Sequence, residues 1–383
     1  MRIGIFTDAY YPIISGVSMS IDILTTELRK LNHEVVIITF EGKNAVPDDF
    51  IVRFKGKALP MNGLKDYKIA KVRKKNIKDL ENLNLDIVHV HTEFTMGRIG
   101  RKYARKYNVP LVYTYHTMYE EYVHFVSPLF KGVSKRIIRK YCNSFIKSVD
   151  QAIFPTIKVK NKFDSFGYNG TPKIIPTGIY LERFRKINFL KKDVSELRDS
   201  LGIKPDETVL VFLGRISREK SLDVLITKFS ELSKVNNKVK LLVVGGGPDM
   251  ENFKILIQNL NIEDKVIFTG MVSPKVVALY YQAGDIFVNF STTETQGLTY
   301  IEALASGVPL LVKYDDNLED VIINGQNGYS FTDDNEFIPL FNKMTSNRLV
   351  FDELTNNTTK TIKKFSAENF AKNILETYKS LLK

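Results

Sequence analysis

Short apolar segments alternate with segments of helical periodicity along almost the whole chain, and this alternation restricts the possible fold more than any other feature. Strands that alternate with helices favour a parallel sheet with helices on both faces. In the first half, the expected strands are RIGIFT, EVVIITF, IVRFK, DIVHVH, PLVYTYH, QAIFP and KIIP. The expected helices of this half lie near residues 17–31, 66–83, 97–107, 130–148 and 157–166.

The same alternation starts again after a polar stretch without a clear strand, residues 181–193, which we interpret as a linker. The expected strands of the second half are TVLVFLG, VKLLVVGG, KVIFTG, DIFVNF and VPLLV. Its expected helices lie near residues 219–234, 249–260, 274–283 and 296–306, and a last helix is expected near 366–382.

These two series predict an α/β protein with two domains, since 383 residues are too many for one ordinary hydrophobic core. We expect two Rossmann-like, doubly wound domains, formed by residues 1–185 and 186–365. Residues 366–383 are expected to form a helix that packs back onto the first domain. Such sheets bind ligands at the carboxyl ends of their strands, so two facing domains would enclose a central cleft.

The composition favours a cytoplasmic protein. The single cysteine, Cys142, cannot form an internal disulfide, which is typical of a reducing compartment. No apolar run approaches the roughly 20 residues that a membrane-spanning helix needs. The sequence also enters a predicted strand at its start, without the apolar core of a signal peptide.

Positive charge is concentrated in the first half of the chain. Residues 1–190 contain 32 lysines and arginines against 17 aspartates and glutamates, a net charge of +15. Residues 191–383 contain 23 against 26, a net charge of −3. Such an asymmetry indicates an anionic surface beside the first half, either nucleic acid or membrane. Because no recognition helix, RNA-binding aromatic pattern or zinc module accompanies the charge, we do not expect nucleic acid as a partner.

Two glutamates flank the start of a predicted helix in the segment ETQGLTYIE, residues 294–302. Leu298, Glu302 and Ala305 follow at i, i+4 and i+7, which is the spacing of one helix face. That face should point inward, and an unpaired buried acid is costly. We therefore expect a cation of the protein or a ligand to meet Glu302, whereas Glu294 in the preceding loop can be favourable to the helix dipole.

A second loop, GRISREK at residues 214–220, brings two cations to the end of a predicted strand. Arg215 offers a planar fork and Lys220 a point charge, and together beside a helix start they suit a diphosphate. Cations of this kind are also common on surfaces, and Lys220 can instead pair with Glu219 or another nearby acid.

Glycines at two further loops, and Gly297 within ETQGLTYIE, allow a close approach of the backbone to a ligand or to another loop. Gly16 precedes the first helix, where N–H groups can meet a phosphate, and Gly246 lies in GGGPDM. The N–H groups of Gly297 and Leu298 are expected to face anionic oxygens at a helix start. The carboxylates can accept hydrogen bonds from hydroxyl groups, and the cations can bind phosphates. Together they match a ligand that consists of a sugar attached to a nucleoside diphosphate.

The motifs ETQGLTYIEALASGVP, GRISREKSLDVLI and GGGP, at these spacings, resemble those of the family-4 glycosyltransferases, which have the GT-B fold. The resemblance covers nearly the full chain. It implies that Arg215 and Lys220 bind the donor diphosphate, that Glu302 holds the ribose diol, and that Glu294 holds hydroxyls of the transferred sugar. It also places Gly16 near the donor phosphates.

The resemblance further implies a catalytic role for His116 in YTYHTMYEEY, which would reach the sugar hydroxyls of the donor together with Glu294, Arg215 and Lys220. Read from the residues alone, His116 is more simply a histidine at a strand end. His89 and His91 fall on one face of a strand, and we interpret them as structural rather than as zinc ligands.

The family implies retention of anomeric configuration, no metal in the site and no cofactor beyond the nucleotide sugar. Retention can proceed through a covalent glycosyl-enzyme or through attack on the same face that the leaving group occupies. Asp8 is the only early carboxylate at a strand end, and no loop residue is a clear nucleophile. We therefore favour the same-face route.

A basic amphipathic helix is predicted within KGVSKRIIRKYCNSFIKS, residues 131–148. Its apolar stripe consists of Val133, Ile137, Tyr141 and Phe145. Its cations include Lys131, Lys135, Arg136, Arg139 and Lys140, with Lys147 further on. Such a helix can lie in a membrane interface with anionic lipid, or its stripe can simply pack on the sheet while the cations face water.

Within the family, the start MRIGIFTDAYYPIISGVSMSI and the block ETQGLTYIEALASGVPLLVKYDDNLEDVI resemble the diacylglycerol glucosyltransferases of low-GC bacteria. This implies transfer of glucose from UDP-glucose to the 3-hydroxyl of 1,2-diacylglycerol, on the inner face of the cell membrane. The alternatives are another acceptor, such as a glycolipid, a polyprenyl-linked sugar or a cell-wall polymer, or an inactive protein that only binds the nucleotide sugar. The sequence does not determine the oligomeric state.

Overall fold

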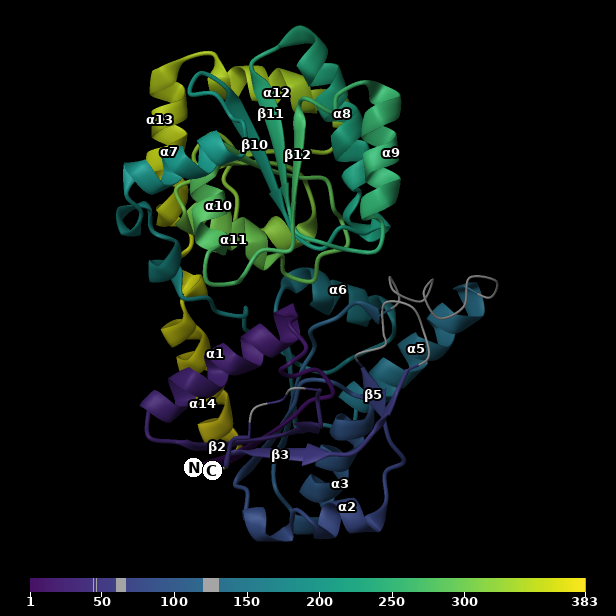
Figure 1. The fold of residues 1–383 in the computed structure, drawn as a ribbon. Helices are drawn as coiled ribbons and strands as arrows, with labels where there is room; N and C mark the ends of the chain where they lie inside the picture. Colours follow the sequence, from purple (N-terminus) through teal and green to yellow (C-terminus); the bar gives the residue numbers. More distant parts are fainter. Residues whose placement is uncertain (44, 46, 60–66, 120–130, 383) are drawn as a thin grey trace. The chain divides into compact units, whose positions relative to one another are not determined.

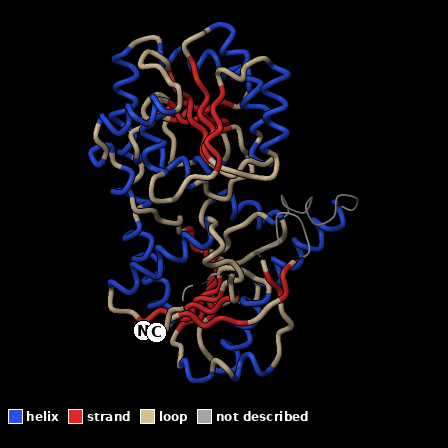
Figure 2. Tube along the Cα trace, in the orientation of Figure 1, coloured by secondary structure: helices blue, strands red, loops and turns tan. Residues whose placement is uncertain are grey.

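The computed structural model describes residues 1–43, 45, 47–59, 67–119 and 131–382, and the chain divides into two α/β units. The first unit consists of Met1–Ile179 with Ser366–Lys383, and the second of Tyr180–Phe365 (Figure 1). Each unit contains its own parallel sheet with helices around it, as the alternation of segments predicted (Figure 2).

The first unit is built on a seven-stranded sheet in the order β3-β2-β1-β6-β7-β8-β9, with every pair parallel. Its strands are β1 (Arg2–Phe6), β2 (Glu34–Phe40), β3 (Ile51–Phe54), β6 (Ile87–Val90), β7 (Leu111–Thr114), β8 (Gln151–Phe154) and β9 (Lys173–Ile174). Its helices are α1 (Gly16–Lys30), α2 (Lys74–Lys78), α3 (Thr95–Tyr107), α5 (Lys131–Ile146), α6 (Ile157–Ser165) and α14 (Ala367–Leu381). The strand order reverses at β1, where doubly wound sheets bind ligands.

The second unit has a six-stranded parallel sheet in the order β12-β11-β10-β13-β14-β15, which reverses at β10. Its strands are β10 (Thr208–Leu213), β11 (Val239–Val244), β12 (Val266–Gly270), β13 (Ile286–Asn289), β14 (Leu310–Lys313) and β15 (Gly328–Phe331). Its helices are α7 (Lys191–Ser200), α8 (Leu222–Val235), α9 (Met250–Leu260), α10 (Val277–Ala283), α11 (Leu298–Ala305), α12 (Phe337–Thr345) and α13 (Arg348–Asn357).

The central strands of both sheets are almost fully buried, which explains their unbroken apolar sequences. The first core gathers side chains from the sheet and from α3, α5 and α6. The second core gathers side chains from the sheet and from α8, α9 and α12. The C-terminal helix α14 packs against α1 in the first unit.

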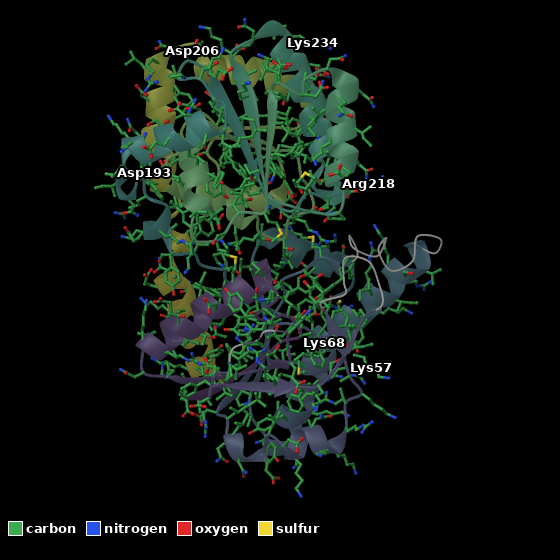
Figure 3. All side chains as sticks on the ribbon, viewed as in Figure 1. Lys57, Lys68, Asp193, Asp206, Arg218 and Lys234 are labelled. Atoms are coloured by element: carbon green, nitrogen blue, oxygen red, sulfur yellow. The ribbon has the colours of Figure 1, made fainter. Side chains whose placement is uncertain are left out.

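The prediction of a helix over residues 66–83 was wrong. Within the described part of this stretch the chain forms the short strand β5 (Lys68–Ile69), then α2, then a 3-10 turn at Glu81–Leu83. β5 pairs in antiparallel fashion with β4 (Lys57–Ala58), and Lys57 and Lys68 both lie on this pair (Figure 3). The N–H of Ala70 donates to Thr95 Oγ1 at 3.2 Å. These pairings hold extended backbone where a helical pattern was expected.

The boundary between the units falls at Ile179, rather than at residue 185 as the sequence suggested. Residues 181–193, expected as a linker, contain 3-10 turns at Leu181–Phe184 and Lys186–Asn188 and the start of α7. Phe184 is buried and contacts Tyr281 of α10 edge to face, with ring centroids 6.0 Å apart. This aromatic contact joins the segment to the second unit.

Candidate functional site

The loops after β10 and β13 bring together two of the residues predicted to bind the donor. Lys220 ends a 3-10 turn at Arg218–Lys220, and Glu294 precedes α11. Lys220 Nζ lies 2.6 Å from Glu294 Oε1, and the two side chains are only 14% and 16% exposed. A charged pair this short and this shielded from water is a strong electrostatic contact. The structure therefore joins the side chains that the sequence assigned to the diphosphate and to the sugar.

Backbone and hydroxyl contacts hold these two loops against each other. The hydroxyl of Thr293 donates to the carbonyl oxygen of Glu219 at 2.8 Å, and the hydroxyl of Ser291 reaches the same oxygen at 3.4 Å. Ser217 Oγ donates to Glu219 Oε1 at 2.6 Å. Glu219 was one predicted partner of Lys220, but its carboxylate accepts from Ser217 instead. The contacts of Ser291 and Thr293 could not be predicted from the sequence, because only the folded loops show what their hydroxyls contact.

Arg215 lies between two backbone hydrogen bonds that fix its loop. The N–H of Gly214 donates to the carbonyl of Val244 at 3.0 Å, and the N–H of Ile216 donates to that of Gly246 at 3.0 Å. The Arg215 side chain is exposed, close in sequence to Lys220. Arg218 of the same loop, labelled in Figure 3, is 79% exposed in its side chain. Its Nε lies 3.6 Å from Asp249 Oδ1.

The glycines of GGGP allow tight packing between neighbouring loops. A Cβ atom on Gly247 would lie 2.1 Å from the carbonyl oxygen of Ile216, and one on Gly245 would lie 1.9 Å from that of Gly214. Gly246 is less restricted, since the closest atom to its Cβ would be in the flexible side chain of Met271, at 2.7 Å. The glycines at 245 and 247 are therefore required by the fold itself, whichever ligand is present.

Helix α11 begins at Leu298 with Gly297 as its N-terminal cap. Gly297 has φ +76°, and a Cβ there would lie 2.3 Å from the ring of Tyr300, so no other residue fits. The first N–H groups of a helix have no partner within the helix and carry partial positive charge. The start of α11, directly after Glu294, is thus suited to an anionic oxygen.

Glu302 lies on the buried face of α11, as its spacing predicted, and is 7% exposed. Its Oε2 accepts a hydrogen bond from the hydroxyl of Tyr281 at 2.8 Å. Burial raises the pKa of Glu302 from 4.5 to about 7, against the lowering effects of the Tyr281 bond and the charge of Arg183. A hydroxyl thus meets the acid directly where the sequence suggested a cation or a ligand.

In the first unit, α1 begins at Gly16 and is capped by Ser15. The N–H of Ser18 donates to Ser15 Oγ at 3.2 Å, while the N–H of Ser15 donates to Ser18 Oγ at 2.8 Å. Gly16 is exposed, has no positive φ, and a Cβ on it would meet no atom within 4 Å. The fold of the first unit therefore does not require glycine at this position.

Replacing Gly16 by alanine is expected to leave the melting temperature within about 2 °C of the wild type, because the added methyl group meets open space. If a donor phosphate approaches this helix start, the same methyl group should raise the KM for the nucleotide sugar roughly tenfold. Calorimetry and initial rates measure both effects. An unchanged KM would show that Gly16 does not contact the donor.

His116 follows β7 and is hydrogen-bonded to His91, with 2.8 Å between His116 Nε2 and His91 Nδ1. Burial lowers the pKa of His116 to about 4, so its imidazole is neutral at pH 7. His89 bonds to Tyr378 and Thr114 at 2.6 and 2.8 Å, in keeping with a structural role. Among the residues that the structure describes, no group of three or more His, Cys, Asp or Glu side chains could hold a metal ion.

Asp8, the early carboxylate considered as a nucleophile, uses both oxygens inside the first unit. Its Oδ2 accepts from Thr92 Oγ1 at 2.6 Å, and its Oδ1 accepts from the N–H of Met96 in the first turn of α3 at 3.1 Å. Burial raises the pKa of Asp8 to about 7. These contacts give Asp8 a structural role as a cap of α3.

The apolar stripe of α5 divides into a buried and an exposed part. Phe145 is buried in the core and Tyr141 is partly buried, whereas Val133 and Ile137 are 61% and 63% exposed. Among the predicted membrane-facing cations, Arg136, Arg139 and Lys140 are exposed and Lys135 is partly buried, while the side chain of Lys131 lies outside the described part. Residues 133–140 of α5 thus present apolar and basic side chains together at the surface.

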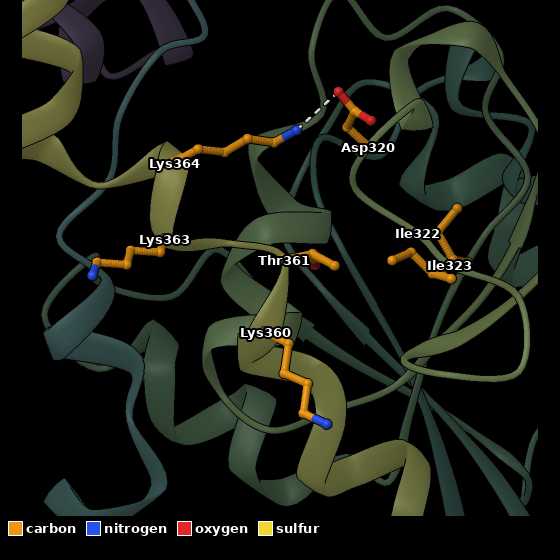
Figure 4. Close-up of a pocket in the computed structure, with 7 residues that line it drawn as sticks. All are labelled: Asp320, Ile322, Ile323, Lys360, Thr361, Lys363 and Lys364. Carbon is orange, nitrogen blue, oxygen red and sulfur yellow. Dashed lines mark ion pairs between the residues drawn. The ribbon is translucent and has the colours of Figure 1, made fainter.

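No described helix is both long and apolar enough to cross a membrane. A surface hollow in the second unit contains none of the predicted site residues (Figure 4). It is lined by Asp320, Ile322, Ile323, Lys360, Thr361, Lys363 and Lys364.

The two parallel-sheet units and the family matches of the chain identify it as a glycosyltransferase with the GT-B fold. Residues 14–183 match the family described as Glycosyltransferase Family 4, and residues 193–365 match Glycosyl transferases group 1. The chain belongs to glycosyltransferase family 4.

Two relatives resemble the chain over nearly its entire length. The alpha-monoglucosyldiacylglycerol synthase of Acholeplasma laidlawii is 36% identical, with 100% of this chain and 98% of the relative covered. The synthase of the same name from Streptococcus pneumoniae is 37% identical, with coverage of 99% and 85%.

Solved structures of low sequence identity share the fold. Anabaena Alr3699/HepE in complex with UDP and glucose superposes with a TM-score of 0.77 at 19% identity, covering 99% of this chain and 100% of the other. Sucrose-phosphate synthase from Thermosynechococcus elongatus superposes with a TM-score of 0.79 at 18% identity, covering 100% and 99%.

Proposed function

We propose that this glycosyltransferase moves glucose from UDP-glucose to the 3-hydroxyl of 1,2-diacylglycerol and releases UDP and α-monoglucosyldiacylglycerol. The observation that carries the proposal is the 36–37% identity, over nearly the full chain, to two relatives named alpha-monoglucosyldiacylglycerol synthase. The site of the second unit supports it, because its cations and carboxylates match the phosphates and hydroxyls of a nucleotide sugar.

In this proposal each side chain of the second unit contacts a particular part of the donor. Arg215 and Lys220 bind the diphosphate, together with the N–H groups at the start of α11. Glu302 accepts hydrogen bonds from the ribose diol, and Glu294 accepts them from hydroxyls of the glucose. Because Lys220 and Glu294 already touch, the donor would bind beside a preformed ion pair.

The reaction that we propose retains the configuration of the anomeric carbon. The oxygen of the acceptor hydroxyl forms a bond to this carbon on the face from which the diphosphate oxygen departs. The hydroxyl proton passes to the departing diphosphate. Negative charge develops on the leaving group, and Arg215 and Lys220 stabilise it, which is the kind of electrostatic effect that dominates many enzymes.

The proposal includes no metal ion and no cofactor beyond the co-substrate UDP-glucose. In this proposal Arg215 and Lys220 neutralise the diphosphate, which is the role that a divalent ion has in a metal-dependent transferase. His116, neutral at pH 7, would contact the sugar hydroxyls of the donor. Full activity in the presence of a strong chelator is the corresponding expectation.

We also propose that the protein works as a peripheral protein on the cytoplasmic face of the cell membrane. Residues 133–140 of α5 combine exposed Val133 and Ile137 with exposed cations, and residues 1–190 carry a net charge of +15. Each basic residue near an anionic membrane contributes about 1 kcal/mol to binding. The lipid acceptor would be reached at this surface.

Replacing Val133 and Ile137 together by serine is expected to weaken binding to vesicles of anionic lipid at least tenfold, since two apolar side chains no longer enter the interface. Flotation of the protein with vesicles measures the effect. The control is the pair Val235→Ser and Ile255→Ser, which removes exposed apolar side chains from the second unit. An equal loss of vesicle binding in both double variants, or no loss in either of them, would contradict a membrane role for α5.

The proposed function is tested by offering UDP-glucose with a panel of acceptors and identifying products by mass spectrometry. The panel contains diacylglycerol, a glycolipid, a polyprenyl-linked sugar and a cell-wall polymer. Glucosyl-diacylglycerol as the main product supports the proposal. Transfer of glucose only to another member of the panel would show that this compound, and not diacylglycerol, is the acceptor. Tight binding of UDP-glucose without any transfer would indicate an inactive binding protein.

A further inference from the structure

Three histidines lie close together at the carboxyl ends of two neighbouring strands in the first unit. His89 lies in β6 and His91 directly after it, while His116 follows β7, which pairs with β6 in parallel. The ring centroids of His89 and His91 are 4.1 Å apart, and those of His91 and His116 are 5.0 Å apart in a stacked arrangement. His89 and His91 look alike in the sequence, but the structure gives them different surroundings.

His89 has partners for both of its ring nitrogens. Its Nδ1 is 2.6 Å from the hydroxyl of Tyr378 in α14, and its Nε2 is 2.8 Å from the hydroxyl of Thr114 in β7. Its ring is fully buried. These contacts account completely for a buried histidine that links the C-terminal helix to the sheet.

His91 differs, because only one of its nitrogens has a partner in the part of the chain that the structure describes. Its Nδ1 is 2.8 Å from His116 Nε2, whereas its Nε2 is buried without a hydrogen-bond partner. Burial and the neighbouring histidines lower the pKa of His91 well below its ordinary value, and burial lowers that of His116. Both rings are therefore neutral at pH 7, and the two facing nitrogens share one hydrogen atom.

This hydrogen can belong to either ring, and the two arrangements have different consequences. If the shared hydrogen were bonded to His116 Nε2, His91 Nδ1 would accept it. The ring hydrogen of neutral His91 would then be on its Nε2, where no acceptor is present. If His91 Nδ1 carries it, His91 Nε2 is only a lone pair. A buried N–H group without a partner is rarer and less favourable than a buried acceptor without one. The surroundings of His91 thus favour a hydrogen bond from His91 Nδ1–H to His116 Nε2.

We propose that His91 is a positioning residue that fixes His116 in the tautomer with its hydrogen on Nδ1. The tautomer of a histidine is set by the hydrogen bond that its other nitrogen makes. His116 then offers a neutral N–H donor at Nδ1, suited to a lone pair on a hydroxyl oxygen of the transferred sugar. This last step rests on the proposed function, whereas the tautomer itself does not.

The tautomer is measured directly by NMR on protein labelled with ¹⁵N-histidine, without substrate and at pH 7.5. The expected result is a protonated Nδ1 with an unprotonated Nε2 in His116, and a protonated Nδ1 with an unprotonated Nε2 in His91. A hydrogen on Nε2 of His116, or a charged His116, would overturn the proposal. Because no sugar is present, this outcome is independent of what the enzyme transfers.

Two variants of His91 separate positioning from mere packing. His91→Phe removes the donor and should leave His116 as a mixture of tautomers, with the KM for UDP-glucose raised about tenfold. His91→Asn retains an amide donor near the Nδ1 position and should restore both the tautomer and most of the affinity. The matched control is Tyr378→Phe, which removes a bond to His89 but should leave the His116 spectrum unchanged.

Each remaining outcome is decisive as well. If His91→Phe shifts the tautomer but leaves the KM unchanged, His116 is positioned by His91 but does not contact the sugar. If Tyr378→Phe changes the His116 spectrum as much as His91→Phe does, the effect is a general loosening of the sheet and the positioning role fails.

Discussion

Lys220→Met is expected to lower kcat by about three orders of magnitude, because the variant loses a largely shielded cation that, in the proposed mechanism, stabilises the departing diphosphate. It is also expected to destabilise the second unit by about 2 kcal/mol, since Glu294 is left as a largely buried carboxylate without its partner at 2.6 Å. Initial rates of UDP release and thermal unfolding measure the two effects separately.

A double variant distinguishes loss of function from loss of fold. Lys220→Met combined with Glu294→Gln removes both charges, so stability should return close to that of the wild type while activity stays lost. Lys228→Met is the matched control, because Lys228 is similarly shielded at 16% exposure and pairs with Glu231 on α8, away from the loops of the site. An active double variant, or an inactive Lys228→Met protein, would contradict the roles assigned to this pair.

Glu302→Gln should make the second unit more stable than the wild type at high pH. The folded state raises the pKa of Glu302 to about 7 from its ordinary 4.5, so the folded state holds a proton that the unfolded state releases. The contribution of this group to stability is full below pH 4.5 and is lost as the pH rises through 7. Glutamine does not titrate, so the variant keeps this stability at high pH. Its free energy of unfolding should exceed that of the wild type by about 3 kcal/mol at pH 8.

The same substitution should remove a pH dependence of donor binding. The ionised carboxylate accepts two hydroxyl hydrogens, whereas the protonated acid competes less well for them, so UDP affinity should rise between pH 6 and pH 8. Glu302→Gln should bind UDP roughly 10- to 100-fold more weakly at pH 8 and show a flat profile. Calorimetric titration measures the affinity, with Glu231→Gln as a surface control. An unchanged affinity would remove Glu302 from the ribose contact.

The overall fold could be predicted because buried parallel strands and amphipathic helices leave periodic signals in the sequence. Glu302 was predictable for the same reason, since a helix face is a local property. The helix expected at 66–83 was wrong because β5 is held by a hydrogen-bonded partner strand, which local periodicity does not contain. The unit boundary was misplaced because Phe184 packs on Tyr281, a contact between residues far apart in sequence.

The site was predictable in its residue types but not in its contacts. Lys220 and Glu294 were each identified from strand-end loops, yet their ion pair joins positions 74 residues apart. His91 and His116 are separated by 25 residues, and nothing in the pattern VHVHTEF distinguishes His91 from His89. Such pairings depend on strand order, here on β6 lying next to β7, and strand order is a property of the whole fold.

The most direct measurement of the central claim is the incubation of the protein with radiolabelled UDP-glucose and vesicles that contain diacylglycerol and anionic lipid. We expect the label to appear in the lipid phase as an α-glucoside of diacylglycerol, and to increase with the anionic lipid content. Release of UDP without labelled lipid, or labelling of a water-soluble sugar while diacylglycerol stays unmodified, would contradict the account.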